Sequence, residues 1–370
     1  MRTETKRKAD RRFLIYIFIL IAVGLVMLAS ASAPLGYTKS SDALFYLKKQ
    51  IISGFFPGLA LLLFFFRLGS EKMQKIGWII YGLSFVLLIL VFIPEIGKMM
   101  NGSRSWLDLG KYGSFQPSEL AKLGLIAALA SVLSNKNKDQ YGSAPGWYAE
   151  LLPPISIMAP ILVLVALQPD IGTFFILSII AFSVLFLSKI SMSRFLVLGI
   201  VGVLVFSALI FSSTRGKQRI ETFLNPELDP QKNGYQIKQA YLAVGSGGWW
   251  GLGLGKSRQK FQYLPEVNAD SIFAVVAEEI GFVFSSLFVL LILLISARAM
   301  KLARRAPDDF SYLLVGGIAV WFAGQAFLNI GSIIGLLPLT GVPLPFVSHG
   351  GSALMTAMAA AGMVLSVSRK

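Results

Sequence analysis

The chain has 370 residues, of which 55% are hydrophobic and 14% are charged, and its formal net charge is +15. Soluble domains carry roughly a quarter of charged residues, so this composition indicates a membrane protein. The absence of cysteine and the single histidine exclude disulfide frameworks and thiolate chemistry, and argue against a histidine-based metal site or a Ser-His triad. The excess of Lys and Arg indicates membrane topology and contact with anionic lipid, and we expect no nucleic-acid partner.

Apolar segments long enough to cross a bilayer recur about ten times. We expect them at 13–32, 50–66, 76–94, 116–134, 151–168, 171–188, 194–212, 271–296, 311–332 and 349–367. Hydrocarbon offers the backbone no hydrogen-bond partners, so each span must be a helix and the fold class is all-α, a polytopic membrane protein. The first span is too long for a cleaved signal peptide, and we interpret it as a retained helix behind a basic tail, residues 1–12.

The distribution of Lys and Arg predicts the orientation of this single transmembrane domain, 1–370. With the N-terminus inside, basic residues are about three times as numerous in the inner segments as in the short outer loops. Both termini are therefore predicted to be cytoplasmic, in the inner membrane. One outer segment, 213–270, between the seventh and eighth spans, is far longer than the others, and long ordered loops are usually functional.

This outer loop is expected to contain structure of its own. The stretch 235–244 predicts a short helix that ends at Gly245 and turns Ile237, Tyr241 and Val244 toward the membrane interface. The glycine-rich stretch 245–255 resembles a phosphate-binding loop only superficially, because no strand precedes it. The basic run 215–219 is either a solvated cluster or a site for pyrophosphate or a lipid headgroup.

Four stretches on the outer side differ from ordinary connectors. They are 104–122, 168–173, 264–270 and 338–352. Each of them leads into a span whose N-terminal end points outward, and helix N-termini favour anions such as phosphate and carboxylate. If these helix starts converge, they form an anion-binding pocket on the outer face.

Ionisable residues inside the predicted spans are expensive and normally face a partner or a wet cavity. Lys122 lies about 9 Å below the outer surface at about 1.5 Å per residue, and Asp170 is its expected partner. A purely structural ion pair is the alternative. Of Glu278 and Glu279, only one needs to face the interior, and Glu278 is favoured because 270, 274 and 278 share one side of a helix.

Asp270 has two interpretations. Aspartate is among the best N-cap residues, and a helix is predicted to begin directly after it. A carboxylate beside an anion site can instead act as a general base toward a sugar hydroxyl. The second interpretation is favoured by the residues expected in the same outer cavity, Lys122, Asp170, Arg219 and Glu278.

These stretches together resemble the SEDS family (shape, elongation, division and sporulation), and the similarity covers nearly the whole chain. The matching segments keep one order: 104–110, 116–122, 168–173, 219 with 223–226, 234–236, 245–255, 259–260, 263–266, 270–281 and 338–352. Within the family, 251–260 followed by 263–266 is most similar to the FtsW-type division branch, and the RodA-type elongation branch is second.

The resemblance implies a ten-helix fold and a peptidoglycan glycosyltransferase that polymerises lipid II and releases undecaprenyl pyrophosphate. It places the family's essential aspartate on Asp270 and its membrane Lys–Asp pair on Lys122 and Asp170. The further residues expected to contact substrate are Arg104, Arg219, Glu278, Glu266 and Ser348. The implied partners are a class B penicillin-binding protein, which is a transpeptidase, and other divisome proteins. No cofactor is identified, and nothing in the sequence supports a divalent cation.

Two departures from the family pattern are visible: Asn268-Ala269 stands where His-Thr is usual, and His349 replaces a usual Tyr. Both are expected to alter hydrogen bonding in the pocket, with His349 a packed residue and not a ligand. Two rival functions stay open. A lipid II flippase would suit ten helices with buried charges, although no inverted repeat is evident and the chemical features gather on one face. A catalytically silent divisome scaffold is the other.

Overall fold

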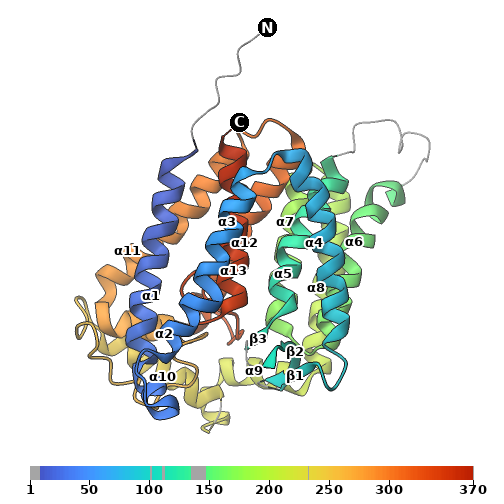
Figure 1. Cartoon of the computed structure of the whole chain (residues 1–370). Helices are drawn as coiled ribbons and strands as arrows, with labels where there is room; N and C mark the ends of the chain where they lie inside the picture. Colours follow the sequence, from blue (N-terminus) through green and yellow to red (C-terminus); the bar gives the residue numbers. More distant parts are fainter. Residues whose placement is uncertain (1–8, 101, 111–112, 135–146, 232, 370) are drawn as a thin grey trace.

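The computed structural model describes residues 9–100, 102–110, 113–134, 147–231 and 233–369. Most of the predicted basic tail falls outside these residues. Within them the fold is all-α and polytopic, as predicted, and a small sheet is its one departure (Figure 1).

Each of the ten predicted spans falls on a helix of the described chain. They are α1 (Arg11–Ser40), the continuous run α2 (Phe45–Gln50), η1 (Ile51–Phe55) and α3 (Phe56–Arg67), α4 (Ser70–Leu90), α5 (Pro117–Ser134), α6 (Trp147–Leu167), α7 (Ile171–Leu187), α8 (Met192–Ser212), α11 (Ile272–Ala303), α12 (Asp309–Ile333) and α13 (Gly351–Ser368). Nine are long and apolar enough to cross a membrane, and α7, with 17 residues, is shorter.

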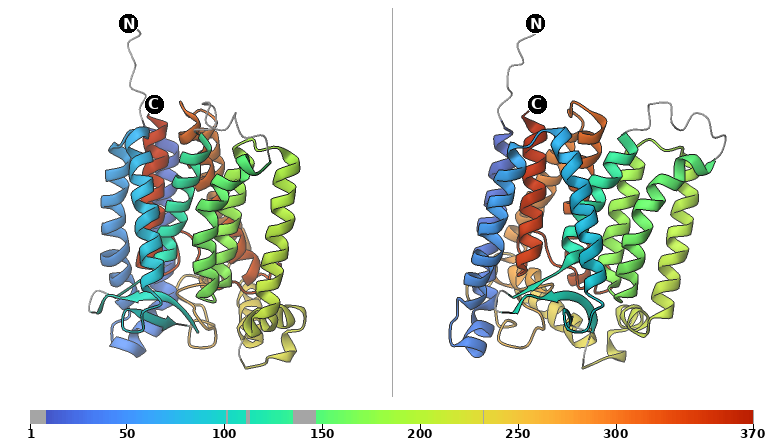
Figure 2. Two further views of the ribbon diagram at one scale, coloured as in Figure 1. Left: turned by 90° about the vertical axis from the view of Figure 1, so that its right-hand side faces the viewer. Right: turned by 45° about the vertical axis from the view of Figure 1, so that its right-hand side comes forward.

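The centre of the bundle consists of α5, α12 and α13, which are mostly buried. Small side chains allow this, because apolar helices in lipid associate through close backbone contact. At the crossing of α13 and α3, a Cβ on Gly362 would lie 2.4 Å from Leu62 O, so only glycine fits there. In contrast, α8 buries none of its apolar window, and both views of Figure 2 place it at the edge of the bundle.

The two described ends of the chain meet at one end of the bundle. Asp10 N–H donates to Ser368 Oγ at 3.1 Å, and Arg298 pairs with the Asp10 carboxylate. Because α1 begins and α13 ends here, the two described ends of the chain lie on the same side, as the orientation argument requires (Figure 1).

The opposite end, which we call the loop end, contains the remaining elements. A three-stranded antiparallel sheet, β1 (Gly97–Met100), β2 (Ser103–Asp108) and β3 (Ser114–Phe115), was not predicted. The long loop forms α9 (Thr214–Leu224), η4 (Pro226–Leu228) and α10 (Asn233–Ser246). The helix predicted at 235–244 is confirmed as part of α10. Its predicted face is wrong in part, because Ile237, Ala240 and Ala243 are buried whereas Tyr241 is exposed.

Candidate functional site

Asp270 lies at the loop end, where the segment 338–350, the start of α7 and α9 meet the start of α11. Gly341 marks the meeting point: a Cβ on this residue would lie 3.5 Å from Arg219 Nη2 and 3.8 Å from Asp270 Oδ2. A Cβ on Gly172, in the first turn of α7, would lie 2.3 Å from Thr340 O. The carboxylate and the guanidinium therefore face one position beside an N-terminal helix end.

The backbone around Asp270 is held from two directions. Asn329 of α12 donates through Nδ2 to Asp270 O and to Val342 O, both at 2.8 Å. Ser348 Oγ donates to Ala269 O at 2.5 Å. Both anchors bind main-chain carbonyls, so they fix the position of Asp270 without neutralising its carboxylate. The predicted residue Ser348 thus belongs to the site as part of its framework.

The carboxylate itself is poorly satisfied. Oδ1 is out of contact with solvent and has no hydrogen-bond partner among the described residues, although Asp270 as a whole is half-buried. The N-cap interpretation is wrong, because Ser271 occupies the N-cap position of α11. Burial and, to a smaller extent, the negative charge of Glu266 raise the pKa of Asp270 to about 7, against the opposing effect of Arg219. A carboxyl group with a pKa near neutrality is a much stronger base than an ordinary aspartate.

Glu266 and Arg219 frame this carboxylate. The Glu266 carbonyl accepts from Ala269 N–H at 3.0 Å and from Ser271 N–H at 3.2 Å, which closes the turn that presents Asp270. Arg219 Nη1 donates to Thr340 O at 3.1 Å. Burial lowers the pKa of Arg219 and the carboxylates of Asp170 and Asp270 counteract this, so the guanidinium remains charged.

Of the basic run that opens the long loop, Arg219 alone faces Asp270. Arg215 donates instead to the carbonyl of Gly102, and Lys217 is exposed. Helical spacing turns Lys217 away from Arg219, since residues two positions apart on α9 do not share a face. Arg215, four residues before Arg219, is instead engaged by its own partner, the Gly102 carbonyl. The interpretation of the run as an anion site therefore applies to Arg219, and the interpretation as a solvated cluster applies to Lys217.

Asp170 caps the neighbouring helix. Its Oδ1 accepts from Thr173 N–H at 3.0 Å and its Oδ2 accepts from Thr173 Oγ1 at 2.8 Å. Gln116, at the start of α5, donates to the same Oδ2 at 3.4 Å. Two of the predicted helix starts thus converge, as expected, and Asp170 links both to Arg219 through its charge.

The expected direct pair between Lys122 and Asp170 is wrong for this structure. Lys122 Nζ lies 2.8 Å from Glu119 Oε1 and 2.8 Å from Gln325 Oε1, and it is buried. Its ammonium lies 5.1 Å from the centre of the Trp321 ring. Asp170 is close enough to act on Lys122 electrostatically, without a hydrogen bond. Glu119 is the residue that the sequence argument missed, although its i, i+3 spacing from Lys122 is a local signal.

Glu278 and Arg104 occupy other places. Glu278 is buried, and its carboxylate accepts from Ser257 Oγ at 2.5 Å, so it holds the loop and is not directed at Asp270. The expectation that only one of the two adjacent glutamates is buried is wrong, because Glu279 is buried as well. Arg104 lies on β2, paired with Met99 of β1.

The two departures from the family pattern contact each other. His349 N–H donates to Asn268 O at 2.7 Å, and the His349 ring packs edge-on against Tyr46 at 5.1 Å. Burial, with the nearby positive charges of Lys49 and Lys39, lowers the pKa of His349 to about 4. The imidazole is therefore neutral near pH 7 and is packed, as predicted. Across the described residues, no group of three or more His, Asp or Glu side chains is placed to hold a metal ion.

Comparison with known proteins identifies the family. The model of the FtsW/RodA/SpoVE family, described as cell cycle proteins, matches residues 11–370, so the chain belongs to this family and the SEDS resemblance is confirmed. The chain is 38% identical over 369 residues to Stage V sporulation protein E of Bacillus subtilis, covering 99% of both chains. It is 35% identical over 371 residues to the probable peptidoglycan glycosyltransferase FtsW of Escherichia coli, covering 99% of this chain and 87% of that one.

Two solved structures share the fold. One is a chain from a structure that concerns the structural coordination of polymerization and crosslinking by a peptidoglycan synthase complex. Its TM-score is 0.78, it is 29% identical, and 98% of both chains is covered. The other is the rod shape determining protein RodA of Thermus thermophilus, with a TM-score of 0.70, 29% identity, and 98% of this chain and 97% of that chain covered.

Proposed function

We propose that this member of the FtsW/RodA/SpoVE family is a peptidoglycan glycosyltransferase that polymerises lipid II into β-1,4 glycan strands. The reaction takes place on the outer face of the cytoplasmic membrane, at the loop end, and serves septal wall synthesis in cell division. The observation that carries the proposal is the Asp270 carboxyl group, with an unpartnered Oδ1, a pKa of about 7 and Arg219 beside it. FtsW-named relatives, similar over nearly the whole chain, support the assignment.

The chemistry follows from these two side chains. Asp270 accepts the proton of the acceptor's GlcNAc 4-hydroxyl, whose oxygen attacks the anomeric carbon of the donor MurNAc. The bond from that carbon to the pyrophosphate breaks with inversion, and undecaprenyl pyrophosphate leaves with the bonding electrons. Arg219 stabilises the negative charge that grows on the leaving group. Because a pyrophosphate needs little protonation to depart, a single carboxylate is sufficient.

The contacts that the other predicted substrate-binding residues make within the protein indicate whether each can touch the substrate. Lys122 binds Glu119 and Gln325, so we assign it an electrostatic effect on the substrate and no direct contact. Asp170 orients the start of α7 toward the segment that faces Arg219. We assign the first pyrophosphate contact to Arg219 and leave Arg104, on β2, for the more distant phosphate or sugar.

Polymerisation of lipid II by the purified chain in detergent tests the proposal, because no transport is possible there. The parent should produce glycan strands on a gel, and Asp270→Ala should produce none while it elutes as a folded protein. Lys238→Ala, which breaks the exposed pair with Glu227, is the matched control and should match the parent. Parental polymerisation by a folded Asp270→Ala variant would refute the assignment, and a silent parent would favour the flippase or the scaffold.

A class B penicillin-binding protein is the proposed partner, which the likeness to a chain of a peptidoglycan synthase complex supports. Polymerisation measured with and without such a transpeptidase should show a higher rate with it. An unchanged rate, with no co-purification of the two proteins, would count against the pairing.

A second role, in sporulation, is favoured by the 38% identity to Stage V sporulation protein E. Depletion in the source organism separates the possibilities by phenotype. Filamentous cells indicate division, round cells indicate elongation, and normal growth with defective spores indicates sporulation. Filaments are the outcome expected from the division proposal.

A further inference from the structure

The helix that begins after Asp270 is broken at Gly281, where φ is 72° and ψ is −178°. The N–H groups of Phe282 and Val283 would bond within an unbroken α11. They donate instead to Gly248 O at 2.8 Å and to Trp249 O at 3.1 Å. The break therefore opens a gap in the helix that the loop 247–260 fills.

The same loop satisfies the other side of the break. Leu252 N–H donates to Glu278 O at 2.9 Å, and Gly253 N–H donates to Glu279 O at 3.0 Å. Backbone groups in a membrane protein must all find partners inside the protein, because lipid provides none. Four bonds from one loop meet this requirement, so the loop is an integral part of α11.

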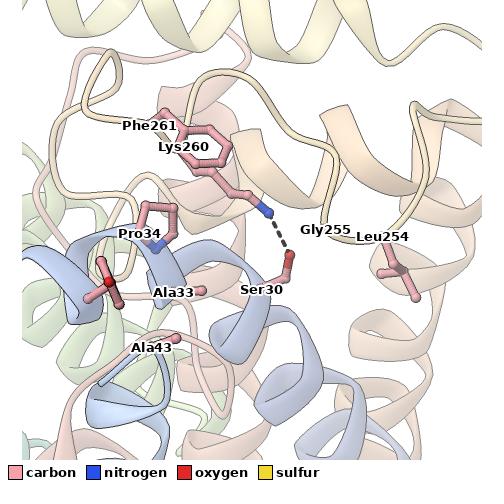
Figure 3. A pocket seen from close by; sticks show the side chains of 9 residues that line it. Ser30, Ala33, Pro34, Ala43, Leu254, Gly255, Lys260 and Phe261 are labelled. Atoms are coloured by element: carbon pink, nitrogen blue, oxygen red, sulfur yellow. Dashed lines mark hydrogen bonds between the residues drawn. The ribbon is translucent and has the colours of Figure 1, made fainter. Parts of the chain in front are cut away.

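Side chains fasten the loop a second time, through five residues that we call the clasp: Ser30, Ser257, Lys260, Glu278 and Glu279. Ser257 Oγ donates to Glu278 at 2.5 Å, and Lys260 Nζ lies 2.8 Å from Glu279 Oε1. Ser30 of α1 donates to Glu279 at 2.7 Å and lies 3.1 Å from Lys260 Nζ, the contact drawn in Figure 3. The clasp thus joins α11, the loop and α1.

The clasp fixes the position of the loop more than it stabilises the fold. The side chains of Lys260 and Glu279 are 4% and 0% exposed, and a buried ion pair of this kind gains little over an apolar pair of the same shape because both charges lose their water. Beside it lies a cavity of about 560 Å³ between α1 and the loop, lined mainly by apolar side chains such as Pro34, Leu254 and Phe261 (Figure 3). Close apolar packing does not hold the loop here, so the polar contacts provide the attachment.

Clasp residues lie before and after Asp270 in the chain. On one side, the loop runs from residue 260 into the turn at 264–270. On the other side, the first segment of α11, 272–280, follows Asp270 and leads to Glu278, which lies about 12 Å away at about 1.5 Å per residue. Asn329 and Ser348 hold the near end of this segment and the clasp holds the far end. A shift of the far end is therefore transmitted along a short helix to the carboxylate.

We propose that the clasp is a positioning element for Asp270, with Glu278 and Glu279 fixing the segment that carries the carboxylate and touching no substrate. The inference rests on the proposed role of Asp270 as the base. Two charged groups face the carboxylate, Arg219 from α9 and Glu266 from its own turn. Loosening the clasp admits water to Asp270 and changes its distance from both.

The test is the double variant Lys260→Met/Glu279→Gln, which removes both charges and leaves neither buried alone. The kcat for lipid II polymerisation should fall by about tenfold or more, because a misplacement of a reacting group by about 1 Å is costly, while KM stays close to parental. The acid limb of the pH–rate profile should move to lower pH, since a better-solvated carboxyl group has a lower pKa. Lys238→Ala, on α10 and outside the clasp, should change neither kcat nor the profile.

Hydrogen–deuterium exchange supplies a readout that does not depend on activity. Peptides covering 264–271 should exchange faster in the double variant than in the parent. Should the double variant fail to fold, Ser30→Ala removes one neutral donor to Glu279 and repeats both measurements. A folded variant with parental kcat, pH profile and exchange would overturn the inference and leave the proposed function intact. A parent without polymerase activity would overturn the proposed function and the catalytic half of this inference, and exchange would still decide whether the clasp holds the segment.

Discussion

Replacement of Asp270 by asparagine is expected to abolish polymerisation and to stabilise the fold above neutral pH. The ionised carboxylate is a cost to the folded protein, because Oδ1 is out of solvent contact without a partner and burial raises the pKa from 3.8 to about 7. Asparagine has nearly the same shape and no charge, so the variant avoids this cost and loses the base.

The magnitude follows from the size of the pKa difference. A rise from 3.8 to about 7 is about 3 pH units at about 1.4 kcal/mol each, so the ionised Asp270 costs at most about 4 kcal/mol. Because the folded pKa lies above the unfolded one, the folded state holds its proton longer. Asp270 therefore costs the fold no stability below pH 3.8. The cost grows as the pH rises toward 7 and is constant above pH 7. Roughly 3 kcal/mol of the loss falls between pH 5 and pH 8.

Apparent Tm in detergent, recorded at one scan rate at pH 5 and pH 8, measures the effect. The Tm of Asp270→Asn minus that of the parent should be clearly larger at pH 8 than at pH 5. Glu227→Gln, at an exposed position, is the control and should show the same difference at both pH values. An Asp270→Asn difference that does not change with pH would refute the reasoning, since the carboxylate would then be solvated or paired.

Three further outcomes are expected. Gly281→Ala should lower Tm and kcat together, by about 2 kcal/mol or more in stability, because the new Cβ would lie 2.2 Å from Gly251 N at a residue with φ of 72°. Lys122→Met should destabilise the fold by about 3–5 kcal/mol in denaturant titration, because Glu119 is left buried without its partner. His349 should lower the stability of the parent by up to about 3 kcal/mol as pH falls from 6.5 toward 4, since its pKa is about 4 in the folded state, while protonation of Asp270 acts in the opposite direction over the same range. The Tm of His349→Phe minus that of the parent should therefore increase as the pH falls through this range in a Tm–pH series.

The spans could be predicted from the sequence because hydropathy is a property of each segment by itself, and all ten fall on helices of the described chain. The sheet at the loop end could not. Its strands have four, six and two residues, too few for a clear alternation, and each depends on a partner strand for its hydrogen bonds. The predicted face of α10 was wrong in part for a similar reason, since packing against α11 decides which side of α10 is buried, and its own pattern of apolar residues does not.

Within the candidate site, single charges were easier to predict than their partners. Asp270 and Arg219 stand out as ionisable residues beside apolar spans, and the structure places them together. Lys122 was assigned to a distant carboxylate although Glu119, three residues earlier on the same helix, binds it. The partners of the glutamates at 278 and 279 lie across a helix break, so no helical periodicity could reveal them.

The arrangement of contacts explains how a base can be strong and fixed at the same time. Hydrogen bonds to the oxygens of a carboxylate would hold it in place but would also lower its pKa and weaken it as a base. Here Asn329 and Ser348 bind the main-chain carbonyls of residues 270 and 269, and the clasp acts from the far end of the helix. The carboxylate of Asp270 is thereby immobilised through its backbone while Oδ1 stays unsatisfied. The unsatisfied carboxylate costs the fold up to about 4 kcal/mol, which Asp270→Asn should relieve. Loss of activity and gain of stability in that variant therefore have one cause, the removal of this carboxylate.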